Sequence, residues 1–343
     1  MTDQSRQFPW LPGSATGVGS MPGTHPVQGC QVVFDELPDF PFLPELPGRG
    51  VGADMVGRTA ALLVDMPVQA TSSGWKLADR PGRDLSRAGG YLSEDLDTLE
   101  EMAEGYEGPV KISVCGPWTL AAALELSRSI DPALRDPGAV TDLTGSLAEG
   151  LTRHVADVRK RIPGASVIVQ LDEPSLPLVL AGRIPTASGL SVVGAVDIAV
   201  ARQRLGSVLA AAGTFTVVHC CAERTPFRLL SEAGASGAGF DLSLLRTADF
   251  DLVAELAESG LALLAGALPT SPAGSGPPLE PRRTAAAVAE MWRRTGLPAE
   301  QFARQVVITP ACGLAGASPA SARAALRHCR EAAGIAPELI DPS

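Results

Sequence analysis

The chain has 343 residues, of which 45% are hydrophobic and 19% are charged, and its formal net charge is −10. This composition is typical of a globular protein with a large buried core, and it excludes a disordered chain. The acidic balance, with no run of Lys or Arg, argues against nucleic acid and against an anionic membrane surface as partners.

The N-terminal stretch and the cysteines indicate a cytoplasmic protein. Residues 1–14 are expected to form a short N-terminal arm, and their first ten lack the basic start and apolar stretch of a signal peptide. No apolar run approaches the roughly 20 residues that span a bilayer. The six cysteines are therefore expected to be thiols or metal ligands in a reducing compartment, not a disulfide framework.

Short apolar runs rich in β-branched residues alternate with helical patterns along the chain. The weakest strand is the second, because Pro41 and Pro44 interrupt it. The predicted elements, in chain order, are strand 15–21, strand 40–45, helix 94–104 with an N-cap at Ser93, strand 110–116, helix 142–161, strand 166–172, helix 199–212, strand 215–220, strand 237–242, helix 250–259, strand 262–268, helix 283–294, strand 306–311 and helix 318–333.

This alternation favours a parallel sheet, and eight strands in a chain of this length fit a closed (β/α)₈ TIM barrel that forms one domain over residues 1–343. An open doubly wound sheet is the alternative, but the Gly-x-Gly-x-x-Gly turn after the first strand is missing. The longest unassigned stretch, about residues 47–87, is expected to be a loop over the barrel mouth.

Metal-capable side chains follow the carboxyl ends of predicted strands, which form the active-site face of a barrel. His219 and Cys221 alternate at the end of one strand, Cys312 follows the last strand, and Asp241 ends the strand between them. Zinc binds imidazole and thiolate together, and alternate strand residues face the same way. A strand that ends earlier would present Cys220 instead, and the alternative interpretation is a set of buried thiols without a metal.

Seven short motifs occur in a definite order over most of the chain, roughly from residue 17 to residue 313 or beyond. They are Gly19-Ser20-Met21-Pro22, Glu45 followed by Asp54-Met55-Val56, Gly74-Trp75, Gly116-Pro117-x-Thr119, Asp172-Glu173-Pro174-Ser175-Leu176, His219-x-Cys221 and Cys312-Gly313-Leu314. Together they resemble the C-terminal catalytic barrel of cobalamin-independent methionine synthase, in the superfamily that includes uroporphyrinogen decarboxylase.

The resemblance implies a zinc-dependent transfer of a methyl group to a thiol, with homocysteine as the acceptor and methionine as the product. His219, Cys221 and Cys312 would be the catalytic zinc ligands. Asp241 occupies the place of the family's remaining ligand, a Glu, and is one methylene shorter. Ser20, Glu45 and Asp172 match the positions that hold the amino-acid thiol, where carboxylates suit an ammonium group.

Three departures from the family bear on the methyl donor. The chain leaves no room for the family's second, N-terminal barrel, Thr270-Ser271-Pro272 stands where the family has His-Ser-Pro, and an Ala-rich run at 121–123 replaces a pterin-stacking Trp. Methyl-folate needs its leaving nitrogen protonated, so the missing His counts against it. The expected donor is therefore a methyl-folate or a methylcobamide, the latter possibly on a corrinoid carrier protein.

Three other functions fit parts of the pattern. The first is a zinc alkyltransferase for another thiol, such as coenzyme M, which would need no ammonium-binding carboxylate. The second is a zinc-free lyase resembling uroporphyrinogen decarboxylase, although the mouth motifs are acidic and thiol-bearing and lack the arginines that a polycarboxylate needs. The third is a catalytically inactive zinc-binding protein.

Overall fold

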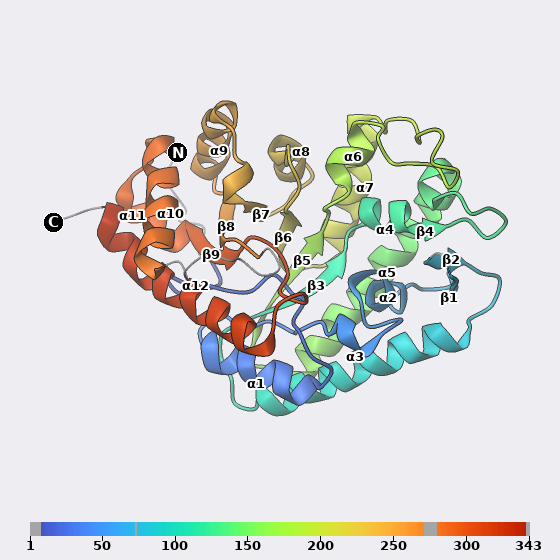
Figure 1. Ribbon diagram of the computed structural model, residues 1–343, viewed down its shortest axis with the longest axis horizontal. Helices are drawn as coiled ribbons and strands as arrows, with labels where there is room; N and C mark the ends of the chain where they lie inside the picture. The colour runs from blue at the N-terminus through green and yellow to red at the C-terminus, as the bar shows by residue number, and fades with distance from the viewer. Residues whose placement is uncertain (1–7, 73, 271–279, 341–343) are drawn as a thin grey trace.

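Six of the eight predicted strands form one parallel sheet in the computed structural model, which describes residues 8–72, 74–270 and 280–340. The sheet order is β3-β5-β6-β7-β8-β9, and helices surround it (Figure 1). Its strands are almost wholly buried, as expected for parallel strands covered by helices. Their bounds are β3 Pro109–Cys115, β5 Ser166–Asp172, β6 Phe215–Cys220, β7 Gly237–Asp241, β8 Ala262–Leu268 and β9 Val306–Pro310.

The first two predicted strands, 15–21 and 40–45, are not strands. They instead form isolated parallel bridges, which link β9 through these two segments to β3. Pro41 and Pro44 have no N–H to donate, so a continuous hydrogen-bond ladder cannot form along the second segment. The bridged pairs are Ala15 with Ile308, Ser20 with Glu45, and Phe42 with Lys111.

Twelve α-helices are described. The predicted helices correspond to α3, α5, α7, α9, α10 and α12 within a few residues, except that α3 begins at Arg83 and places Ser93 inside the helix, not at its N-cap. The bounds are α1 Pro26–Glu36, α2 Met55–Ala60, α3 Arg83–Met102, α4 Pro117–Ala123, α5 Pro137–Arg161, α6 Leu176–Leu180, α7 Ile198–Ala211, α8 Phe227–Glu232, α9 Phe250–Glu258, α10 Pro281–Thr295, α11 Ala299–Gln305 and α12 Pro319–Ile340.

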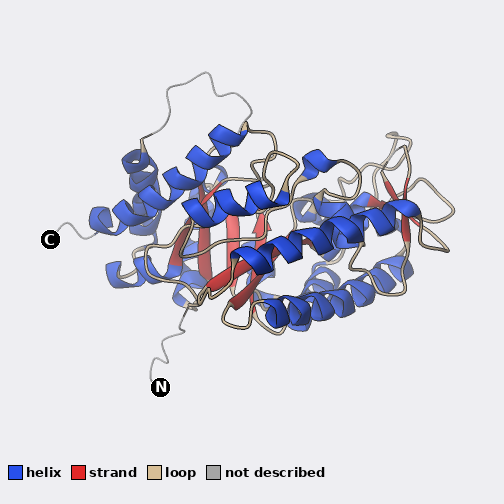
Figure 2. Ribbon diagram, turned by 90° about the horizontal axis from the view of Figure 1, so that it is seen from below, coloured by secondary structure: helices blue, strands red, loops and turns tan. Residues whose placement is uncertain are grey.

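The stretch 47–87 is not the plain loop that we predicted. It contains α2 and two short strands, β1 (Val68–Ala70) and β2 (Trp75–Leu77), which join β4 (Leu124–Glu125) in a second sheet. This small sheet lies apart from the main one, at the opposite end of the view (Figure 2). Asp54 begins α2 by accepting hydrogen bonds from the N–H groups of Val56 and Gly57, both at 3.0 Å.

The N-terminal arm packs against residues from the amino ends of the strands. Trp10 is 6% exposed and stacks on Phe40 with ring centroids 5.4 Å apart. This apolar cluster, which we call the lower core, comprises Trp10, Phe40, Ile168, Val217, Ala262, Leu264 and Val307. A larger apolar core lies between the sheet and its helices. None of the helices described here is both long and apolar enough to cross a membrane.

Candidate functional site

Three of the predicted ligands converge at the carboxyl ends of β6 and β9. The potential ligand atoms of His219, Cys221 and Cys312 all lie within 4.8 Å of one another. His219 is buried, and its Nε2 has no hydrogen-bond partner among the residues described. Cys220 is fully buried away from this group, as alternation along a strand requires. An imidazole with an orphaned nitrogen beside two thiols is a donor set that fits zinc.

Two glycines make room for this arrangement. Gly239 pairs with His219 across β6 and β7, and a Cβ at position 239 would come within 2.9 Å of the imidazole Nδ1. Gly313 passes so close to Ser20 that a Cβ would lie 2.0 Å from the Ser20 Oγ. The chain after Cys312 therefore needs glycine to reach the site, and Ser20 lies directly against it.

The two thiols of the cluster interact strongly. The sulfur atoms of Cys221 and Cys312 are 3.3 Å apart. The contact with Cys221 and the neighbouring His219 lower the pKa of the Cys312 thiol, and the same contact between the sulfurs, together with burial, raises the pKa of Cys221. The thiolate is the form that binds a metal ion, so a lowered pKa at Cys312 suits a metal ligand.

Asp241 is not brought into this cluster. Its Oδ1 accepts hydrogen bonds from the N–H and hydroxyl of Ser243, at 2.8 and 2.6 Å, and caps the short helix that follows β7. A carboxylate one methylene longer would reach further from the same backbone position. Its expected role as a fourth ligand therefore stays a prediction.

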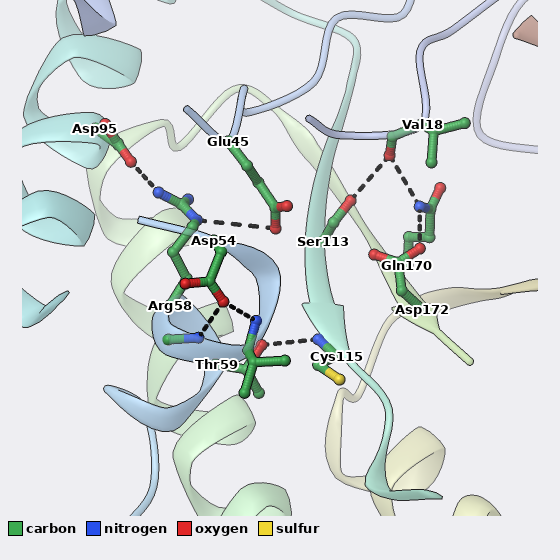
Figure 3. A network of polar contacts seen from close by, with 12 residues as sticks. Val18, Glu45, Asp54, Arg58, Thr59, Asp95, Ser113, Cys115, Gln170 and Asp172 are labelled. Carbon is green, nitrogen blue, oxygen red and sulfur yellow. Dashed lines mark hydrogen bonds and ion pairs between the residues drawn. The ribbon is translucent and has the colours of Figure 1, made fainter. Parts of the chain in front are cut away.

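Asp172 ends β5 beside His219 and is buried. Its Oδ1 accepts a 2.7 Å hydrogen bond from the Gln170 amide, whose oxygen accepts a 2.8 Å bond from the Lys111 ammonium. Figure 3 shows Gln170 between Asp172 and the carbonyl of Val18. Burial raises the pKa of Asp172, opposed by electrostatic interactions with His219 and Lys111, and burial lowers the pKa of Lys111 to about 8.

Glu45 lies on the neighbouring segment, where its backbone pairs with Ser20. The carboxyl is fully buried, and its Oε1 has no hydrogen-bond partner in the described part of the chain. Burial raises the pKa of Glu45 to about 7, although the nearby charge of Arg58 opposes the shift. The structure therefore places a buried carboxyl that lacks a hydrogen bond at Oε1 near Asp172, while the backbone of Ser20 pairs with Glu45 and its side chain lies against Gly313, next to Cys312.

Glu173 has a structural role that the sequence did not reveal. Its carboxylate accepts hydrogen bonds from the N–H groups of Trp118 and Thr119 and from the Thr119 hydroxyl, at 2.7 to 2.9 Å. The Thr119 hydroxyl in turn accepts from the N–H of Ser175. A Cβ at Gly116 would fall 2.4 Å from the Glu173 carboxylate. The Gly-Pro-x-Thr and Asp-Glu-Pro-Ser motifs therefore fit each other directly.

Sequence reasoning missed Lys111, Gln170 and Arg58. A signal existed for Lys111, because a lysine between valine and isoleucine in a buried strand has to find polar partners inside. No comparable signal marked Arg58, since its meaning depends on how α2 packs beside Glu45. Ser271 and Pro272, at the place of the family's His-Ser-Pro, lie outside the described residues.

Comparison with known proteins gives a family match and a match to a solved fold. Residues 109–335 match the family described as "Cobalamin-independent synthase, Catalytic domain". Among solved structures, a B12-independent methionine synthase from a Shewanella species, in complex with selenomethionine, matches with a TM-score of 0.60 at 13% identity. The match covers 95% of this chain and 97% of that one.

A tryptophan synthase from Pyrococcus furiosus matches at 11% identity over 96% of this chain and 97% of that one, and its TM-score of 0.39 carries no argument. No curated protein matches the sequence. The methionine synthase structure shares the fold, and the family match spans most of the chain. The chain therefore belongs to the family of cobalamin-independent synthase catalytic domains, which indicates a methionine-synthase-like enzyme.

Proposed function

We propose that the protein transfers a methyl group to the thiol of homocysteine, giving methionine, with a zinc ion held by His219, Cys221 and Cys312. The observation that carries the proposal is the convergence of these three donors beside the buried carboxyls of Glu45 and Asp172. Family membership supports the reaction class. The proposal treats the six strands and two bridged segments as one (β/α)₈ domain acting in the cytoplasm, where thiols stay reduced.

Three protein ligands suit a catalytic zinc, because such sites keep one position for substrate. Bound zinc would keep a coordinating substrate thiol ionised near neutral pH. Asp241 is proposed as an additional ligand only if its turn opens, since the carboxylate already accepts two hydrogen bonds from Ser243. Soft thiolates and a neutral imidazole favour zinc over magnesium or calcium.

The amino-acid part of the substrate is assigned to Ser20, Glu45 and Asp172. An ammonium group that reaches the Glu45 carboxylate, which accepts no hydrogen bond at Oε1 from the described residues, would form a charge-assisted hydrogen bond with it. Gln170 leaves the second oxygen of Asp172 available, because the amide bonds only Oδ1. These contacts would orient the substrate sulfur toward the donor, which lowers the entropic part of the barrier.

The reaction itself balances simply. The thiol loses its proton to solvent, its sulfur forms a bond to the methyl carbon, and the bond from that carbon to the donor breaks with the electron pair leaving on the donor, where a folate nitrogen takes up a proton. The family is described as cobalamin-independent, so a corrinoid carrier protein gains no support, and methyl-folate becomes the first donor to test. The family match likewise argues against the decarboxylase alternative.

The metal is tested by its content in purified protein and in three cysteine variants. We expect about one zinc per chain in the wild type, and loss of both zinc and turnover in Cys221→Ser and Cys312→Ser. Cys220→Ser is the matched control, because the neighbouring thiol is buried away from the cluster and should leave zinc in place. A wild type that takes up no zinc after reconstitution would rule out the proposal.

The substrates are tested by methionine formation from homocysteine with a methyl-folate or with a methylcobamide. Activity with the folate alone would remove the corrinoid, whereas activity with the cobamide alone would restore it. Turnover of coenzyme M at a rate equal to homocysteine would favour the alternative thiol. Zinc binding without turnover of any thiol would identify an inactive zinc-binding protein.

A further inference from the structure

The carboxyl of Glu45 is in an environment that works against its proposed task. It is buried near Asp172, and Asp54 adds a second negative charge nearby. A protonated carboxyl is a weak partner for an ammonium group, because only the ionised form offers a charge-assisted hydrogen bond. A nearby positive charge is therefore needed that favours the ionised form of Glu45 without forming a hydrogen bond in place of the substrate ammonium.

Arg58 meets both requirements. Its Nε lies 3.8 Å from the Glu45 Oε1, which is beyond hydrogen-bond distance but close enough for strong attraction (Figure 3). Both side chains are only 5% exposed, so solvent screens the pair little. Its guanidinium supplies the positive charge that this attraction needs.

A buried carboxylate, Asp95, holds the Arg58 head in place. The Arg58 Nη1 contacts Asp95 of α3, which is 1% exposed. Arg49 binds both oxygens of the same Asp95 through Nη2, at 2.6 and 2.7 Å. Asp95 therefore pairs with both Arg49 and Arg58. Arg58 in turn lies between two carboxylates, Glu45 on one side and Asp95 of α3 on the other.

The helix that carries Arg58 is also fixed. Asp54 caps α2, and the Thr59 hydroxyl accepts a 2.7 Å hydrogen bond from the N–H of Cys115 at the end of β3. Gly57 packs so tightly that a Cβ would lie 2.6 Å from the Gly52 Cα. These contacts fix the position of helix α2, so that Arg58 lies beside the carboxyl end of β3, where Glu45 also lies.

We propose that Arg58 is a positioning residue that orients Glu45 and favours its ionised form by charge, without a hydrogen bond to the carboxylate, so that α2 makes the site select amino-acid thiols over thiols without an amino group. This inference rests on the proposed function, because the site has to bind a thiol first. It assigns a purpose to α2, which lies in the stretch 47–87 that was expected to be a loop.

The test compares two thiols in zinc-loaded protein. One is homocysteine and the other is 4-mercaptobutyrate, which has the same chain without the amino group. Arg58→Met should raise the KM for homocysteine roughly ten- to a hundredfold. The reason is that the substrate ammonium would lose its charge-assisted hydrogen bond to the Glu45 carboxylate. The KM for 4-mercaptobutyrate, the kcat for homocysteine and the zinc content should not change. Arg58→Lys should restore most of the affinity.

Arg49→Met is the matched control, because Arg49 also pairs with Asp95 but does not contact Glu45. It should lower the thermal unfolding temperature without changing the preference between the thiols. An equal loss for both thiols in Arg58→Met, or the same loss of preference in Arg49→Met, would overturn the inference. Arg58→Gln provides a second test if Arg58→Met does not fold.

Calorimetric binding of the two thiols separates this inference from the proposed function. If the wild type binds homocysteine more tightly than 4-mercaptobutyrate and Arg58→Met removes that preference, the role of Arg58 stands even where no methyl donor gives turnover. If the wild type binds both thiols equally, the role of Arg58 is wrong, while methyl transfer to some thiol can still be correct. If neither thiol binds, both proposals fail.

Discussion

The two ends of the strands in the six-stranded sheet differ in kind, although the same strands build both. In β5, Ile168 belongs to the apolar lower core, and Gln170 and Asp172 follow it at alternate positions. In β6, Val217 is followed in the same way by His219. Alternate residues of a strand keep the same orientation, so the environment changes from apolar to polar along the strand axis alone.

The apolar end of the strands contributes to stability, whereas the polar end carries the groups proposed to bind substrate and metal. The lower core gains free energy from apolar burial and contains no group proposed to react. The carboxyl end buries a lysine and several carboxyls whose desolvation opposes folding. Substitutions in the lower core should therefore change the free energy of unfolding, and those at the carboxyl end should change binding.

The largest expected effect on stability is at Trp10. Trp10→Ala should lower the free energy of unfolding by about 3–5 kcal/mol, because it removes a large buried ring from the lower core. Urea unfolding measures this loss. Leu11→Ala is the control, since Leu11 is 60% exposed and should change stability by less than about 0.5 kcal/mol. Loss of zinc in folded Trp10→Ala would show that the two ends are not independent.

The opposite behaviour is expected of Asp172→Asn. Removing the carboxylate should raise the KM for homocysteine roughly ten- to a hundredfold. The free energy of unfolding should stay equal or increase, because the variant removes a buried charge while its amide oxygen can still accept from Gln170. Steady-state kinetics and urea unfolding test the two halves. A loss of stability as large as that of Trp10→Ala would contradict the comparison.

A smaller and pH-dependent effect is expected of Glu45→Gln. The folded pKa of Glu45 is about 7, above its ordinary value of 4.5, so the folded state favours the protonated form. Its stabilising contribution is complete below pH 4.5 and is lost as the pH rises through 7. The wild type should therefore lose about 2 kcal/mol between pH 5 and 8 that the glutamine variant keeps. If the wild type and the glutamine variant differ in stability by the same amount at both pH values, Glu45 is ionised throughout.

Much of the fold could be predicted because its physical signals are local. Six parallel strands appear as apolar runs, and their neighbours in the chain are also neighbours in the sheet. The two failures, 15–21 and 40–45, have the correct position but lack a continuous ladder. Length and apolar character identify such a segment, whereas its hydrogen bonding depends on prolines and on the partner segment.

The candidate site was predictable where strand alternation decided the outcome. His219 and Cys221 share a face, and the end of the last strand brings Cys312 beside them. The site was not predictable where a side chain depends on another element, as for Arg58 and Glu173. Asp241 shows the same limit, because the turn that follows β7 uses its carboxylate as a cap.

The contact between Thr119 and Glu173 has a consequence for the evolution of such chains. The two residues belong to motifs 54 positions apart, yet each satisfies hydrogen bonds that the other would leave unmet in the interior. A lineage that lost the threonine first would keep a poorly paired buried carboxylate, and one that lost the glutamate would expose two amide donors to an apolar surrounding. Substitutions at these positions should therefore be inherited together, and relatives are best recognised by the pair.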